Sequence, residues 1–350
     1  MTIAEKLTRA KADIDSAYGA GLIAGAGAYL LSEFLKWRDC HGLCMGQPSI
    51  VSVPSFDATG ATDMTSMFKS CTSLTTVGSI SNTSNVTNMG YMFYGCTALT
   101  TVPLFNTSNV TNMGYMFYSC PALTTVPLFN TSNVTSMEAM FQNCTALTTV
   151  PEFNTSNVTD MNSMFYYCPA LTTVPEFNTS KVTNMGSMFN DCRQLTTVPL
   201  FNTSNVTYIA YMFNKCITLT MVPLFDIRNV TQTNFMFNSC NNLTDVRLRN
   251  IKADLQVGSG TSWGHLLTVD SLIHLIYELR DTGSVKKLTV GGANLEKLAN
   301  VYVKPIEITD EMRAEDDLVD EKFPFVVCES TEEGAMLITA YVGFKNWSLT

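Results

Sequence analysis

Residues 106–129 read NTSNVTNMGYMFYSCPALTTVPLF, and nearly the same 24 residues recur throughout the middle of the 350-residue chain. A fixed period of this length is typical of a solenoid, because each unit buries its apolar face only against its neighbours. The sequence therefore predicts eight stacked units. They are marked by cysteines 24 residues apart, with one extra residue between the first two: Cys71, Cys96, Cys120, Cys144, Cys168, Cys192, Cys216 and Cys240.

Each repeat combines two local patterns. Its first part has apolar residues that fall within about 120° of one helical face; in residues 106–129 these are Met113, Met116, Phe117, Cys120 and Leu123. Residues 124–129, TTVPLF, favour extended structure, and their proline lacks the N–H that a helix needs. The next residues, Asn130–Asn133, favour a polar turn. We therefore predict an α/β repeat solenoid, with a short strand, a turn and a short helix in each unit.

The repeated pattern C-x-x-L-x-x-V-P-x-F-N-T-S-N-V-T-x-M-x-x-M-F-x-x-C extends from Val53 to Val246 and resembles the BspA-like leucine-rich repeats of bacterial and phage surface proteins. The resemblance implies a leucine-rich-repeat-like fold and a role in adhesion or surface display. Beyond the repeats, the phrases LTVDSLIHLIYEL, KKLTVGGANLEKL and FKNWSLT resemble a C-terminal module of gut phage and prophage proteins.

Three parts are expected along the chain. Residues 1–50 are predicted to be a helical segment for capping or attachment, residues 51–248 the solenoid, and residues 249–350 an α+β capping module. The N-terminal helix is compatible with docking on the first repeat or with oligomerisation. In the capping module we expect a strand at Lys287–Val290, and an acidic segment at residues 307–333 that departs from the family pattern.

The charge of the repeats limits the possible partners. The chain has a net charge of −9, but residues 52–246 contain only nine acidic and five basic residues. Such a surface cannot neutralise phosphates, which argues against nucleic acid as a partner. No segment is long and apolar enough for a transmembrane helix, so no membrane insertion is expected. Asp13 and Asp15 interrupt the N-terminal basic and apolar pattern, which disfavours a secretion signal.

The cysteines and histidines do not indicate catalysis. The cysteines of the repeats share a face with the core Met and Phe residues, where a reduced Cys acts as a small buried hydrophobe. Cys40, His41 and Cys44 lack a nearby fourth ligand, so we predict no metal site and no cofactor. Neither paired carboxylates, nor a nucleophile with a base, nor a phosphate-binding loop has a supporting context. The sequence predicts a protein that is not an enzyme.

A binding surface is expected on the side of the repeats opposite the core. Aromatic rings with polar handles suit contacts to protein or sugar without charge. The candidate ligand-binding residues occupy two positions of the repeat: Tyr91, Tyr94, Tyr115, Tyr118, Tyr166 and Tyr211. An alternative surface is a ladder of hydroxyl groups formed by Thr100, Thr101, Thr124, Thr125, Thr148 and Thr149.

Together these features favour a non-enzymatic recognition protein. The first hypothesis is a phage virion or tail-associated adhesin that is made in the host cytoplasm and binds a host-surface protein or glycan. Its N-terminal helix then attaches to the virion or mediates self-association. The alternatives are a BspA-like adhesin on the bacterial cell surface, and a structural or decoration protein without a specific ligand.

Overall fold

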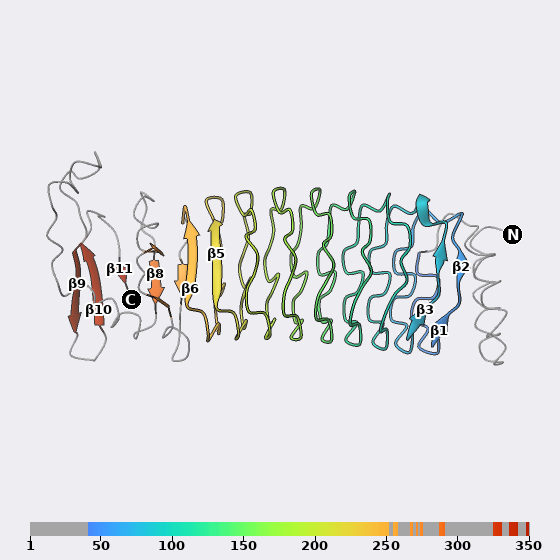
Figure 1. Ribbon diagram of the computed structural model, residues 1–350, viewed down its shortest axis with the longest axis horizontal. Helices are drawn as coiled ribbons and strands as arrows, with labels where there is room; N and C mark the ends of the chain where they lie inside the picture. The colour runs from blue at the N-terminus through green and yellow to red at the C-terminus, as the bar shows by residue number, and fades with distance from the viewer. Residues whose placement is uncertain are drawn as a thin grey trace. The chain divides into compact units, whose positions relative to one another are not determined.

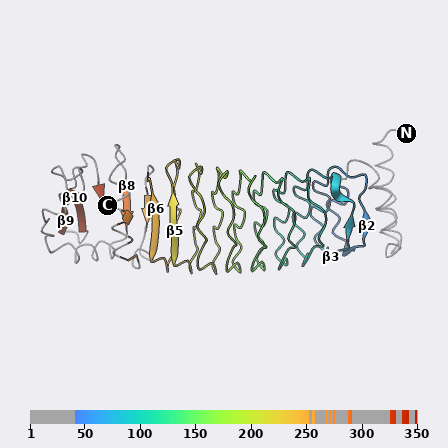
Figure 2. The ribbon, with the colours of Figure 1, turned by 45° about the horizontal axis from the view of Figure 1, so that its top comes forward.

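The computed structural model describes residues 41–251, 255–257, 267–268, 271, 274–275, 287–290, 325–330, 336–341 and 348–349. It divides into two compact units, residues 1–181 and residues 182–350. Within each unit the repeats form rungs that lie side by side (Figure 1). The same rungs stay side by side in the turned view of Figure 2, so the predicted stacking of repeats is confirmed within each unit.

The predicted short helix in each repeat is wrong. In the second repeat, residues 89–99 form successive turns, in which the N–H groups of Met92, Tyr94 and Cys96 donate to carbonyls three residues earlier, at 3.3, 3.0 and 3.1 Å. The N–H groups between them donate instead to the next repeat: those of Tyr91 and Phe93 reach carbonyl oxygens 3.0 and 2.9 Å away. Hydrogen bonds within the turns therefore alternate with hydrogen bonds to the next repeat, and together they use the backbone N–H groups of this segment.

The spacing of the rungs explains why turns replace the helix. Hydrogen bonds between backbones hold neighbouring segments about 4.8 Å apart, whereas packed helices need about 8–10 Å between axes. Parallel bridges at one position of the repeat connect Asp63, Asn88, Asn112, Ser136 and Asp160 in succession. A helix does not fit between rungs at this spacing, so the apolar residues reach the core from turns.

These turns require residues in the left-handed region of backbone conformation. Two positions per repeat, four residues apart, have positive φ, as at Tyr115 (58°) and Ser119 (55°). In the second repeat the later position is Gly95, with φ of 71°. A residue other than glycine is disfavoured in this region by about 1–2 kcal/mol. The bonds to the adjacent rung offset this cost.

The extended parts of the repeats form strands only at certain rungs. In the first unit, β1 (Ser52–Val53) pairs in parallel with β3 (Thr76–Val77), and β2 (Phe56–Asp57) with β4 (Ile80–Ser81). In the second unit, β5 (Met221–Asp226) pairs in parallel with β6 (Asp245–Arg249), with a register shift between Val222 and Phe225.

Proline explains where this pairing stops. The repeats between these strands carry a proline at the position held by Gly78 and Arg247, as in Pro103 and Pro127. The N–H of Gly78 donates to the carbonyl of Val53 at 2.7 Å, a bond that proline cannot make. The predicted strand is therefore an extended segment in the middle repeats, and paired strands form where Gly78 or Arg247 replaces the proline of the later rung.

The core is a set of columns, each contributed by one position of the repeat. The Met, Phe, Cys and Leu residues of these positions are buried, and many are fully enclosed. Rings of adjacent rungs stack, as in the pair Phe93 and Phe117, whose centroids lie 5.6 Å apart at an interplanar angle of 3°. The predicted core residues are thus confirmed, although turns rather than a helix direct them inward.

Hydrogen bonding explains the cysteine column. The thiol of Cys120 donates to the carbonyl of Phe93 in the preceding repeat at 3.1 Å, and that carbonyl also accepts the N–H of Cys96 at 3.1 Å. The same thiol-to-carbonyl bond recurs along the column, for example from Cys144 to Phe117. The nine described cysteines are buried, and none of them forms a disulfide bond.

The polar turn between rungs is built from side chains that bond the backbone. The Asn106 side chain accepts the N–H of Ser108 at 2.9 Å, and the Thr107 hydroxyl donates to the carbonyl of Asn130 in the next repeat at 2.8 Å. The Asn109 amide donates to the carbonyl of Ser84 in the preceding repeat. Only the first such turn forms a 3₁₀ helix among the described residues, η1 (Thr83–Asn85).

The remaining elements lie in the second unit. β7 (Leu255–Val257), β8 (Lys287–Val290) and β11 (Ser348–Leu349) form a parallel sheet in the order β11-β8-β7, which confirms the predicted strand at residues 287–290. β9 (Phe325–Ser330), from the predicted acidic segment, pairs antiparallel with β10 (Met336–Tyr341). The predicted N-terminal helix lies outside the described residues.

Candidate interaction surface

Four of the six predicted tyrosines form one cluster, named here the tyrosine patch: Tyr91, Tyr94, Tyr115 and Tyr118. The rings of Tyr91 and Tyr115 stack with centroids 4.7 Å apart and an interplanar angle of 3°. Those of Tyr94 and Tyr118 stack at 4.5 Å and 2°. Within a rung the two rings are tilted, with centroids 5.8 Å apart in one rung and 5.9 Å in the other. All four side chains are half-buried.

Opposite charges border the patch at its two ends. The Lys69 ammonium lies over Tyr91 and Tyr94, 5.2 and 4.8 Å from the ring centroids, where the negative ring faces attract it. At the other end the hydroxyl of Tyr115 donates to a carboxylate oxygen of Glu138 at 2.6 Å. Burial, this hydrogen bond and the charge of Glu138 raise the pKa of Tyr115, so its hydroxyl stays a donor at physiological pH.

The local backbone explains how the rings come together. Tyr91 and Tyr115 occupy the first positive-φ position of their turns, and Tyr94 and Tyr118 lie three residues later. Rung stacking repeats each position at the spacing of hydrogen-bonded backbones, which matches the contact distance of aromatic rings. The predicted outward orientation on a helix is therefore replaced by side chains that stand on turns and cover one another.

The other two predicted tyrosines lie apart from the patch. Tyr166 belongs to the first unit, but Gln142 occupies its position in the rung between it and Tyr118. Tyr211 belongs to the second unit, where it stacks on Phe235 with centroids 5.1 Å apart. The structure thus brings four of the six predicted residues together.

In the second unit the position of Tyr94 and Tyr118 is taken by asparagines. The amide of Asn214 donates to Asn190 at 2.9 Å, and the amide of Asn238 donates to Asn214 at 2.7 Å. This amide ladder uses the same rung spacing as the tyrosine stacks. One position of the repeat therefore supports either stacked rings or hydrogen-bonded amides.

The six predicted threonines of the alternative surface are exposed. Some of this hydroxyl ladder is used internally, since the Thr100 hydroxyl donates to the carbonyl of Thr75 at 3.3 Å and that of Thr172 to Thr148 at 3.4 Å. Sequence reasoning missed a nearby row of exposed leucines. Leu104 and Leu128 are 63% and 59% exposed, and the alternation in VPLF, with Val and Phe inward, is the signal that points them outward.

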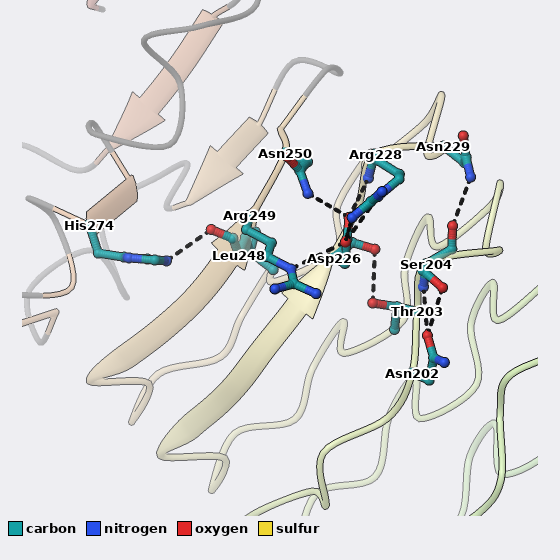
Figure 3. A network of polar contacts seen from close by, with 10 residues as sticks. All are labelled: Asn202, Thr203, Ser204, Asp226, Arg228, Asn229, Leu248, Arg249, Asn250 and His274. Carbon is teal, nitrogen blue, oxygen red and sulfur yellow. Dashed lines mark hydrogen bonds and ion pairs between the residues drawn. The ribbon is translucent and has the colours of Figure 1, made fainter. Parts of the chain in front are cut away.

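A second polar cluster, also missed from the sequence, closes the repeats of the second unit (Figure 3). The buried carboxylate of Asp226 accepts hydrogen bonds from Arg228, from Asn250 at 3.0 Å and from Arg249 at 3.2 Å. Burial by itself raises the pKa of Asp226, but the hydrogen bonds from Arg228 and Asn250 lower it to about 2. Residues 226–229 read DIRN where the earlier repeats have NTSN, and this change is the signal in the sequence that could have revealed the cluster.

The polar edge of β6 next to this cluster is covered by side chains. The Ser271 hydroxyl accepts the N–H of Val246 at 2.9 Å, and His274 Nε2 lies 2.9 Å from the carbonyl of Leu248. The residues drawn in Figure 3 are connected by hydrogen bonds and ion pairs that link adjacent rungs at the end of the repeats. We therefore assign them a structural role.

Among the residues that the structure describes, no set of three or more His, Cys, Asp or Glu side chains could hold a metal ion. The described residues also contain no helix with the length and apolar character needed to cross a membrane. The tyrosine patch, in contrast, offers hydroxyls and ring edges, which suit binding.

The repeats match a known family. The model of the family described as "Mycoplasma protein of unknown function, DUF285" matches residues 47–150 and 147–250, which together make up more than half of the chain. The chain belongs to this family. The resemblance to BspA-like repeats is thereby confirmed at the level of the DUF285 repeat. A search of curated proteins found no match.

Solved structures that align with this DUF285 chain are leucine-rich repeat proteins. An internalin from Listeria monocytogenes aligns at 13% identity over 70% of this chain and 81% of its own, with a TM-score of 0.23. A leucine-rich repeat protein from Eubacterium ventriosum aligns at 18% identity over 60% of this chain and 76% of its own, with a TM-score of 0.27.

Proposed function

We propose that this DUF285 chain is a non-enzymatic recognition protein that binds a host-surface protein or glycan through the tyrosine patch. The observation that carries the proposal is the gathering of Tyr91, Tyr94, Tyr115 and Tyr118 on two adjacent rungs. Clustered, half-buried tyrosines supply much contact area at a small loss of conformational entropy, and they are enriched among the residues that dominate binding energy.

The more specific proposal is that the protein is a phage virion or tail-associated adhesin. The phrases within residues 267–350 that resemble phage and prophage proteins support this location. Mass spectrometry of purified virions is expected to detect the chain together with tail proteins. Detection on intact bacterial cells and not in virions favours the alternative, a cell-surface adhesin.

The binding test uses substitutions that the chain itself contains. In the sixth repeat, Ser187 and Asn190 stand at the two positions of the tyrosine patch, so the fold accepts these residues there. The patch variant therefore combines Tyr91→Ser and Tyr115→Ser with Tyr94→Asn and Tyr118→Asn. Its matched control replaces the two predicted tyrosines that lie outside the patch, by Tyr166→Asn and Tyr211→Ser.

Both variants and the original protein are labelled and mixed with a panel of gut bacterial cells. The patch variant is expected to lose at least about ten-fold in affinity for the cells that the original protein binds, because tyrosines at binding centres commonly contribute more than 1.4 kcal/mol. The control variant is expected to bind as the original does. Equal binding by a folded patch variant contradicts the proposal and moves the site to the threonine surface or the C-terminal module.

A further inference from the structure

We infer that the ligand of the tyrosine patch is a polypeptide segment that carries an Asp or Glu side chain, and not a glycan. The inference rests on the proposed function and names the class of its partner. It follows from three features of the patch: most ring faces are covered, the backbone edges are used, and one end carries a cation without a carboxylate partner among the described residues. Each feature is visible in the contacts of residues 69–142.

The covered ring faces argue against sugar stacking. A pyranose ring that binds an aromatic residue packs its C–H groups on the ring face, where the negative charge of the quadrupole lies. Here Tyr91 and Tyr115 cover one face of each other, as do Tyr94 and Tyr118. The other faces of Tyr91 and Tyr94 lie under the Lys69 ammonium. The patch therefore presents ring edges and hydroxyls to a ligand.

The remaining faces, those of Tyr115 and Tyr118, are turned towards the next repeat. The residues at the same two positions of the next repeat are Ala139 and Gln142. The N–H of Tyr115 donates to the carbonyl of Glu138 at 2.8 Å, which holds the two rungs at backbone spacing. The Glu138 side chain is bonded to the Tyr115 hydroxyl at 2.6 Å, so a carboxylate borders these remaining faces.

The backbone around the patch cannot accept an added strand. The N–H groups of Tyr91 and Gly95 donate to the carbonyls of Gly114 and Tyr118, at 3.0 and 2.7 Å. Those of Tyr115 and Ser119 donate in the same way to the following rung. Since these donors are used inside the array, a bound polypeptide contacts side chains rather than pairing with the backbone.

The charge of Lys69 selects the partner's chemistry. The Lys69 residue is half-buried, its ammonium lies over two rings, and it forms no ion pair with a carboxylate within the described part of the chain. A partner carboxylate completes this site with a charge-assisted hydrogen bond. At the opposite end Glu138 repels a carboxylate, so the two charges fix the direction in which an acidic segment lies.

The dimensions of the patch fit a short segment. Lys69 and Glu138 lie in the first and fourth repeats, so three rung steps of about 4.8 Å separate them, or about 14 Å. An extended polypeptide covers this distance with about four or five residues. The side chains of such a segment can pack against the tyrosine edges in between.

The test uses the full-length protein with two defined probes. One is an array of random 12-residue peptides, and the other is an array of neutral and sialylated oligosaccharides. The protein is expected to bind peptides enriched in Asp and Glu. The patch variant is expected to lose at least about ten-fold of this signal, while circular dichroism shows that it is folded.

A single substitution tests the role of the cation. Gln142 stands at the position of Lys69 in another repeat, so Lys69→Gln is compatible with the fold. This variant is expected to bind peptides without the preference for Asp and Glu. The control is Lys181→Gln, because Lys181 belongs to the same unit and donates to Asn157 away from the patch; it is expected to retain the preference.

Three results would overturn parts of this picture, and they are distinguishable. Oligosaccharide binding that the patch variant abolishes overturns the polypeptide assignment but leaves the proposed function in place. Peptide binding that depends on the patch but has the same acidic preference in Lys69→Gln overturns the role of the cation. Binding that the patch variant leaves unchanged on either array overturns both the inference and the proposed function.

Discussion

At the scale of single residues, the cysteine column shows how a buried polar atom is accommodated. The thiols lie among Met and Phe side chains, yet they donate to backbone carbonyls, as Cys120 does to Phe93 in the preceding rung. Burial raises the pKa of Cys120 to about 12, so the thiol stays protonated and can donate this bond. The position thus favours a small, weakly polar donor over a purely apolar residue.

Replacing Cys120 with Ser tests this account. The hydroxyl keeps a donor that can reach the Phe93 carbonyl, so Cys120→Ser is expected to lower the free energy of unfolding by only about 1 kcal/mol. The comparison is Val110→Thr, which places a hydroxyl at another fully buried position. That variant is expected to lose about 1–3 kcal/mol. Chemical denaturation measures both, and a larger loss for Cys120→Ser would contradict the role of the carbonyl.

A second residue-scale prediction concerns backbone strain. Ser163 has a φ of 56°, in the region that glycine adopts freely and other residues adopt at a cost in free energy. Ser163→Gly is therefore expected to raise the free energy of unfolding by about 0.5–1 kcal/mol. The control is Ser73→Gly, since Ser73 is not among the positive-φ residues. This control is expected to lower the free energy of unfolding by about 0.5–1 kcal/mol. If both variants change stability alike, the turn geometry is not the cause.

At the scale of the element, the rung is the unit of stability. Its turns and extended segment form most of their hydrogen bonds with the adjacent rungs, as between Thr111 and Thr87 at 2.8 Å. A rung can therefore be removed whole, because the flanking rungs present the same donors and acceptors to each other. Part of a rung cannot be removed without loss of register.

Two deletions test the rung as a unit. Removal of residues 154–177 excises one period and leaves the tyrosine patch intact, and we expect a cooperative fold that is less stable by about 1–4 kcal/mol. Removal of residues 166–177 instead places Ser180 at the position of Cys168 and Thr183 at that of Leu171. Circular dichroism during thermal unfolding is expected to show no cooperative transition for this second variant. Equal behaviour of both would refute the modular account.

The Asp226 cluster predicts a pH dependence at the end of the repeats. Its pKa is lowered to about 2 from an ordinary value of 3.8, so between these values the unfolded chain binds more protons. The stabilisation is present above about pH 4 and is lost as pH falls towards 2. We expect it to be on the order of 1 kcal/mol, since solvent screens the half-exposed guanidinium groups.

The comparison of Asp226→Asn with the original protein isolates this effect. The difference in unfolding free energy between them is expected to shrink as pH falls from 4 to 2. Asp245→Asn is the control, because Asp245 lies more exposed beside Arg247 than Asp226 does beside its arginines. A difference that stays constant over this pH range would show that Asp226 carries no such linkage.

At the scale of the whole molecule, the thiols report on the integrity of the stacked rungs. The described cysteines are buried and free, and burial raises the pKa of those that shift, to about 11 at Cys71 and about 12 at Cys168. An alkylating reagent at neutral pH is therefore expected to leave the column unlabelled in the native protein. After unfolding without reductant, all eleven thiols of the chain are expected to react. Mass spectrometry that shows disulfides between neighbouring rungs would contradict this.

The sequence by itself determined the repeat, its period and the residues of its core. The recurring spacing of Met, Phe, Cys and Leu was enough to identify the period and the core residues, because duplicated units bury the same positions whatever their backbone conformation. It also indicated the tyrosines, because they recur at positions between the buried ones. Local periodicity alone suggested a helix, since the spacing of Met113, Met116 and Phe117 matches a helical face.

The tertiary structure decided the conformation and the candidate site. Hydrogen bonds between rungs, such as that from Tyr115 to Glu138, hold the backbones too close for helices and turn the same residues into successive turns. The same spacing stacks Tyr91 on Tyr115 and places Lys69 at the end of the patch. These contacts join residues about one repeat apart, so only the stacking of rungs could show that four of the six tyrosines form one surface.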